Sequence, residues 1–276
     1  MNDIQSKIKA VLEVILVYLL VYVILSLLMA SSLGKWENQN LKRFSLYIVI
    51  VFVPLIILAA TRRNFSAYGI SFKNFRYHLG IVAACFIPVI LLSIVLVTFN
   101  WRTWTGALII SAIEIVLIFV IALVLRKTPS DNPGNALLLL MPLIMLSLKM
   151  RAGNVASDIV YFYLLVGPGE EILFRGYFQS RLNEAFGRPF TFFGIQWGWG
   201  LLIASILFGF WHVLNPSTFN LFLGNYNLMW PHGLWTVFLG LILGIIREKT
   251  GSITSPAILH SIVNYPPQAI VFAFLG

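Results

Sequence analysis

The chain has 276 residues, of which 59% are hydrophobic and only 11% are charged, and its mean hydropathy is +0.88. Because a soluble domain carries about 25% charged residues, this composition excludes a soluble globular protein and predicts one embedded in a membrane. The net charge of +9 does not indicate nucleic acid, because the basic residues cluster at the ends of apolar runs, where lipid headgroups lie.

Four long apolar runs occupy the first half of the chain, at residues 10–31, 44–61, 79–99 and 104–125. Each is close to the ~20 residues that a helix needs to cross the hydrocarbon of a bilayer. Shorter runs follow at residues 136–148, 155–167, 201–214, 233–246 and 253–274. Since backbone polar groups in lipid must be satisfied within a helix, we expect an all-α, polytopic transmembrane bundle of about eight spans.

Basic residues indicate the orientation of these spans. Lys7 and Lys9 precede the first run, which is too long for the apolar core of a signal peptide, so we expect an uncleaved span with a cytoplasmic N-terminus. The loop 62–77 contains four basic residues and no acid, and we expect it to face the cytoplasm as well. The turn-forming segment 130–135 divides the chain into an N-terminal four-span half, 1–135, and a C-terminal half, 136–276.

Three polar groups interrupt the apolar second half, and each is costly to place at membrane depth. They are Glu170-Glu171 with Arg175, then Phe208 with His212, and finally His260 with Asn264. A carboxylate can activate water, a histidine can move protons or hold a metal, and an amide can stabilise an oxyanion. Together these groups are the side-chain set that hydrolyses a peptide bond, and we expect them to line one cavity.

Spacing assigns different tasks to the two glutamates. After Gly167-Pro168-Gly169 a helix can begin at the glutamates, and Glu171 and Arg175 are then an i,i+4 ion pair. This pairing leaves Glu170 free to act on water. The alternative is a solvated ion pair where a helix enters the interface, with His212 as an interfacial histidine. His260 and Asn264 also share one helical face, and their alternative role is an interhelical hydrogen bond.

Other polar residues in or near the apolar runs carry less weight. Glu114 lies in the middle of the fourth run, and we expect a protonated carboxyl bonded to a neighbouring helix rather than a functional group. Glu13 and Asp158 are expected at the interface, and His78 and His232 on the loop side of the apolar runs. The single cysteine, Cys85, lies within a span, so no intramolecular disulfide can form.

The three polar groups resemble the motifs of the CPBP intramembrane endopeptidase family, also called the Abi or CAAX-protease family, which includes the type II CAAX prenyl endopeptidase. Glu170, Glu171 and Arg175 match EExxxR, Phe208 and His212 match FxxxH, and His260 and Asn264 match the final motif, which is HxxxN or HxxxD. The motifs occur in the family's order. The resemblance implies a peptidase in a prokaryotic plasma membrane that cleaves membrane-associated or lipidated protein substrates and contacts lipid but no nucleic acid.

Two mechanisms fit these residues. In the metal-free mechanism, which we favour, Glu170 is the general base, His212 orients the water, and His260 and Asn264 stabilise the oxyanion. In the other, Glu170, His212 and His260 coordinate a zinc ion with water in the fourth position. The chain lacks HExxH, so the sequence predicts no firm cofactor and leaves zinc open.

Two other functional classes compete with the peptidase. One is a non-catalytic membrane protein that binds a peptide toxin as an immunity protein or scaffold. The other is a secondary transporter, but transporters place polar residues in corresponding halves of a repeat, and here they are concentrated in one half. For a peptidase we expect a cavity that opens both laterally to lipid and to the cytosol.

Overall fold

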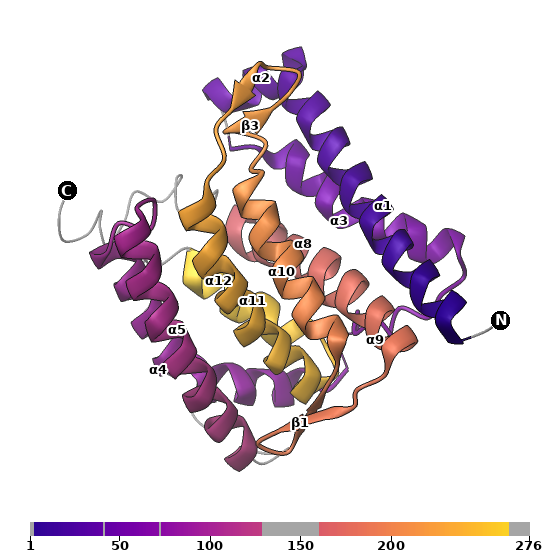
Figure 1. Ribbon diagram of the computed structural model, residues 1–276, viewed down its shortest axis with the longest axis vertical. Helices are drawn as coiled ribbons and strands as arrows, with labels where there is room; N and C mark the ends of the chain where they lie inside the picture. Colours follow the sequence, from indigo (N-terminus) through magenta and orange to yellow (C-terminus); the bar gives the residue numbers. More distant parts are fainter. Residues whose placement is uncertain (1–2, 41, 72, 129–159, 265–276) are drawn as a thin grey trace.

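The computed structural model describes residues 3–40, 42–71, 73–128 and 160–264, and these residues are almost entirely helical (Figure 1). Four of the described helices are long and apolar enough to cross a membrane: α1 (Asp3–Ala30), α4 (Phe75–Thr98), α5 (Trp104–Lys127) and α11 (Trp230–Thr250). Two apolar helices are shorter, α3 (Phe44–Ala60) and α10 (Trp199–Val213). The prediction of an all-α membrane bundle is confirmed.

The predicted total of about eight spans and the division of the chain into two halves stay predictions. The run at 136–148, the loop at 130–135 and the residues after 264 lie outside the described part of the chain.

The remaining helices are α2 (Ser32–Asn40), η1 (Val160–Val166), α8 (Gly167–Glu171), η2 (Ile172–Gln179), α9 (Ser180–Phe186) and α12 (Thr254–Asn264). The segments from η1 to α9 follow one another without a break, so residues 160–186 form one helical column. The helix expected to begin at the glutamates therefore begins earlier, and Pro168 lies inside the column, where η1 meets α8. η1 and η2 are π-helical, a geometry found frequently at functional sites.

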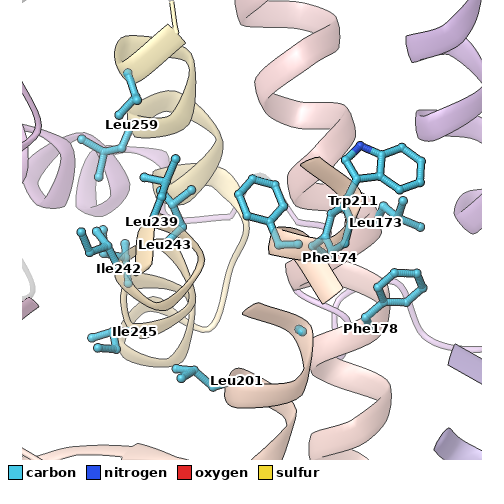
Figure 2. Close-up of a cluster of buried hydrophobic side chains, with 14 of the residues drawn as sticks. Leu173, Phe174, Phe178, Leu201, Trp211, Leu239, Ile242, Leu243, Ile245 and Leu259 are labelled. Atoms are coloured by element: carbon cyan, nitrogen blue, oxygen red, sulfur yellow. The ribbon is translucent and has the colours of Figure 1, made fainter. Parts of the chain in front are cut away.

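The helical column lies at the centre of the bundle, with α1 and α3 on one side and α10 and α12 on the other (Figure 1). α11 packs between α10 and α5, and α4 packs against α5 and α12. Figure 2 shows part of the buried core, where Phe174 and Phe178 of η2 lie near Trp211 of α10. Large apolar side chains such as Leu16 and Val116 are exposed on the outer helices, as a lipid-facing surface requires.

Two glycines allow α10 and α11 to approach closely. A Cβ atom on Gly209 would lie 2.3 Å from Cγ2 of Val237 and 2.8 Å from the carbonyl oxygen of Gly233. A Cβ atom on Gly233 would lie 2.1 Å from Cγ2 of Val213. Small residues at helix crossings are a common device for packing in membranes, and here they set the spacing between the helices that carry His212 and His232.

Two short hairpins lie at opposite ends of the bundle (Figure 1). β1 (Phe190–Phe192) pairs antiparallel with β2 (Ile195–Trp197), after the end of α9. β3 (Phe219–Asn220) pairs antiparallel with β4 (Asn225–Tyr226), between α10 and α11 and beside α2.

Several polar residues lie elsewhere than the sequence suggested. His78 lies in the first turn of α4 and is buried there, with Nδ1 3.0 Å from Oγ of Ser255. Glu114 is fully buried in α5, but both carboxyl oxygens lack a hydrogen-bond partner among the described residues, so the expected bond to a neighbouring helix is absent there. Glu13 binds Arg63, Tyr177 and Arg181 and thereby ties α1 to the helical column. Asp158 lies outside the described residues.

Candidate active site

The boundary between α8 and η2 places the EExxxR residues in the interior of the bundle. Nη1 of Arg175 lies 2.9 Å from Oε1 of Glu171, and the exposed fractions of the two side chains are 1% and 0%. Nη2 of Arg175 donates to the carbonyl oxygen of Gly240 at 3.2 Å, and the guanidinium lies over the ring of Phe208 at 4.4 Å. The predicted i,i+4 pair is therefore present, and its burial excludes the alternative of a solvated interfacial pair.

His260 connects the two glutamates. Its Nδ1 lies 2.9 Å from Oε1 of Glu171, and its Nε2 lies 3.7 Å from Oε2 of Glu170. Because a carboxylate accepts hydrogen bonds, we assign a proton to Nδ1, which leaves Nε2 directed at Glu170. Glu171 thus orients His260 as well as pairing with Arg175, a contact across 89 positions of the chain that spacing could not reveal.

His212 is oriented by its own helix. Its Nδ1 lies 2.8 Å from the carbonyl oxygen of Phe208, so Nδ1 carries the donated proton and Nε2 remains available. The ring of Phe208 packs edge-on against His212 at 4.6 Å and against His260 at 5.7 Å. The phenylalanine of FxxxH is therefore the apolar surface against which both imidazoles and Arg175 rest.

Glu170, His212, His260 and Asn264 all line one cavity, with about 390 Å³ of space for water. The expectation that these four side chains face a common space is met in the geometry, whereas their chemical roles stay predictions. The C-terminal half does not build this cavity alone, because α1 and α3 supply one wall. That wall consists of Leu25, Met29, Arg43, Leu46, Tyr47 and Ile50.

Two cavity residues escaped the sequence reasoning. Tyr47 on α3 interacts electrostatically with Glu170 and also with Tyr161 of η1, but it belongs to no motif. His232, for which the sequence suggested only a position near a loop, lies in the first turn of α11 and lines the cavity. Its ring lies 4.7 Å from the ring of His212 and is stacked on Trp235 at 5.3 Å. The only available signal for His232 was its position before an apolar run, which many interfacial histidines share.

The residues considered for zinc do not converge as a ligand set. Both nitrogens of His260 face carboxylates, and Nδ1 of His212 faces a backbone carbonyl. Within residues 3–128 and 160–264, apart from positions 41 and 72, no three His, Cys, Asp or Glu side chains are arranged to hold a metal ion.

The cavity lies toward the end of the bundle that is remote from the loop 62–74. Its lining residues come from the C-terminal ends of α1 and α10 and from the N-terminal ends of α3 and α11. The loop 62–74 follows the other end of α3, and the backbone of Gly69 accepts a hydrogen bond from Ile253, beyond the far end of α11. The cavity-lining residues and the basic loop thus lie toward opposite ends of the bundle.

The fold and the cavity define an integral membrane protein with a buried polar centre. Residues 152–266 match the family model described as type II CAAX prenyl endopeptidase, Rce1-like. Over this matched segment the chain is similar to the CAAX-protease family, the same family that its three motifs resemble. This is a protease family, which supports peptidase activity on a peptide or protein substrate at the membrane. The comparison with curated proteins finds no match, and the comparison with solved structures finds none either.

Proposed function

We propose that the protein is an intramembrane endopeptidase in which Glu170 activates water to hydrolyse a peptide bond of a membrane-associated or lipidated substrate. The observation that supports it best is that the Glu170 carboxylate, the His212 and His260 imidazoles and the Asn264 amide all line a single cavity. A scaffold that only binds a peptide toxin has no need for this combination of groups.

In this mechanism Glu170 takes a proton from water as the water oxygen attacks the carbonyl carbon of the substrate. His212 accepts the second O–H of that water at Nε2, because its Nδ1–H is committed to Phe208. Asn264 and His260 stabilise the oxyanion, and Glu171 holds His260 in place through its Nδ1. When the tetrahedral intermediate collapses, the C–N bond breaks and Glu170 passes its proton to the leaving amine.

The first test replaces the general base without changing its size. Glu170→Gln should lower turnover of membrane-anchored peptides by ~10²–10⁴-fold, the contribution of a positioned general base. The measurement is cleavage by the purified protein in lipid vesicles, followed by mass spectrometry. Glu114→Gln is the matched control, because Glu114 is equally buried in a membrane helix but does not line the cavity. Equal turnover by wild type and Glu170→Gln would refute the assigned role.

A second test addresses the amide. Asn264→Ala should lower kcat by ~10²–10³-fold with little change in KM, as loss of an oxyanion donor does in other hydrolases. Asn264→Asp keeps the size of the side chain but replaces the N–H donor, so it should be as inactive as the alanine variant. An active Asn264→Asp protein would contradict donation from this position.

A third test decides the role of zinc. Metal content and activity are measured on one dialysed sample, before and after treatment with a chelator. The proposed mechanism predicts no stoichiometric metal and unchanged activity. One zinc per chain, with activity restored only when zinc is returned, would instead assign Glu170, His212 and His260 as ligands and leave the peptidase function in place.

A further inference from the structure

Arg43 is a cavity residue with unused hydrogen-bonding capacity. It lines the cavity at the start of α3, where the side chain is half-buried. Its Nε and Nη2 donate to Oδ1 of Asn38 at 3.1 and 2.8 Å, and its Nη1 donates to Oγ of Ser217. A guanidinium has five N–H donors, and these bonds use three of them, so two N–H donors remain available.

The charge of Arg43 is also unpaired. Its acceptors are a neutral amide and a neutral hydroxyl, and no carboxylate of the described residues lies within ion-pair distance of it. By contrast, Arg63, Arg175, Arg181 and Arg188 each contact a glutamate. A half-buried cation beside a cavity, with donors to spare and no counter-ion, is suited to receive an anion from outside the chain.

Arg43 is connected to the proposed general base through Tyr47. Arg43 is the N-cap residue of α3 and Tyr47 lies four positions further along, and both line the cavity. Tyr47 interacts electrostatically with Arg43 at one side and with Glu170 at the other. An anion bound at Arg43 would therefore lie next to the site of hydrolysis, but separated from the Glu170 carboxylate by a phenol ring.

We propose that Arg43 is a specificity-determining residue that binds a carboxylate of the peptide substrate. The substrate class is thereby narrowed to peptides that carry a carboxylate close to the scissile bond, either a free C-terminus or an acidic side chain. This inference rests on the proposed peptidase function. A planar guanidinium accommodates a carboxylate through two parallel N–H···O bonds, which gives orientation as well as affinity.

The experiment uses the full-length protein in vesicles of neutral phosphatidylcholine and three matched sets of randomised, N-acylated peptides. One set has a free C-terminal carboxylate, one has a C-terminal carboxamide and no acid, and one has a carboxamide with an interior glutamate. Wild-type protein should cleave one of the two acidic sets with a kcat/KM about 10–100-fold above that of the neutral set, mainly through KM, as expected for a charge-assisted hydrogen bond. The preferred acidic set identifies the source of the carboxylate.

Three variants separate recognition from folding. Arg43→Gln should erase the preference by lowering kcat/KM for the preferred acidic set to the value for the neutral set, and Arg43→Lys should retain part of the preference. Lys35→Gln removes one exposed charge from the same end of the bundle and should leave the preference intact. Asn38→Ala removes the acceptor of two Arg43 bonds but keeps the guanidinium, so it too should preserve the preference.

Each other outcome overturns the inference. Equal loss of acidic and neutral cleavage in Arg43→Gln and Asn38→Ala would make Arg43 a purely structural residue. Absence of a preference in wild type would reject the carboxylate site and leave the peptidase standing. Loss of the preference in vesicles containing phosphatidylglycerol would show that Arg43 holds a lipid headgroup. If no peptide is cleaved, fluorescence anisotropy measures the binding of labelled acidic and carboxamide peptides. Tighter binding of the acidic peptides that depends on Arg43 would support the carboxylate site, and equal binding of both peptides would reject it.

Discussion

The Glu171–Arg175 ion pair has no access to water, because the exposed fractions of its side chains are 0% and 1%. A buried pair contributes little net stability while it is intact, but removal of one partner leaves an uncompensated charge. The cost of that loss is ~3–5 kcal/mol, which makes the pair a structural requirement of the site before any chemistry takes place.

We therefore expect Glu171→Gln and Arg175→Ala each to lower the thermal unfolding midpoint in detergent, and to impair activity through misorientation of His260 or loss of fold. The Asp3–Lys7 pair is the control, because it has the same i,i+4 separation but lies at the surface. Asp3→Asn should cost only ~0–1 kcal/mol. Midpoints that fall equally in all three variants, or fall in none, would contradict the distinction between buried and exposed pairs.

At the scale of single residues, the spacing of residues along the sequence predicted contacts within one helix but could not predict which residues of different helices touch. The Glu171–Arg175 contact follows from helix geometry alone, since residues four apart lie on one face. The contact between Glu171 and His260 depends on how α8 packs against α12, and residue spacing contains no information about that packing. The same reason explains why Tyr47, Arg43 and His232 were not predicted as cavity residues.

At the scale of elements, the crossing of α10 and α11 determines the distance between His212 and His232. Gly209→Ala would bring a methyl group within 2.3 Å of Val237 and 2.8 Å of the Gly233 backbone, and only the valine can move aside. We expect a destabilisation of ~1–3 kcal/mol, typical of overpacking, together with reduced turnover because the helices move apart.

The matched control for this change is Gly176→Ala in η2. The nearest atom to an added Cβ there is the carbonyl oxygen of Glu171 at 3.5 Å, an ordinary contact. Gly176→Ala should therefore be tolerated, and thermal unfolding in detergent compares the two variants. Equal stability of both proteins would show that the glycines of α10 and α11 do not set the helix spacing.

Hydropathy predicted the long helices well, because about 20 apolar residues in sequence allow few structures other than a span. Hydropathy did not predict the segments in which the backbone departs from regular α-helical geometry. The π-helical turns on either side of the glutamates and the two short hairpins have no periodic pattern of their own. Hydropathy also could not show that α3 turns Arg43 and Tyr47 inward, because a helix that is apolar all round has no evident inner face.

At the scale of the whole molecule, charge is distributed unequally between the two ends. The end that includes the loop 62–74 carries most of the described basic residues, namely Lys7, Lys9, Arg62, Arg63, Lys73, Arg76, Arg126, Lys127, Arg181, Arg188, Arg247 and Lys249. The end nearer the cavity carries Lys35, Lys42, Arg43 and Arg102. The positive-inside rule therefore favours a cytoplasmic loop 62–74 and a cavity nearer the opposite membrane face.

Cysteine labelling tests this orientation directly. The native Cys85 is fully buried and should not react with a membrane-impermeant maleimide, so the wild-type protein should show no labelling. Ala67→Cys, in the basic loop, should be labelled only from the cytoplasmic side. Leu221→Cys, exposed between β3 and β4, should be labelled only from the other side. The reverse pattern would place the cavity toward the cytosol and refute the charge argument.

The cavity wall formed by α1 and α3 lies outside the segment that matches the family model. The groups proposed to activate water and those that would select the substrate thus belong to separate stretches of chain. Mutations in α1 and α3 can alter which peptide is accepted while leaving the water-activating residues untouched. A lineage of such proteins could diversify its targets through the first stretch and conserve one reaction in the second.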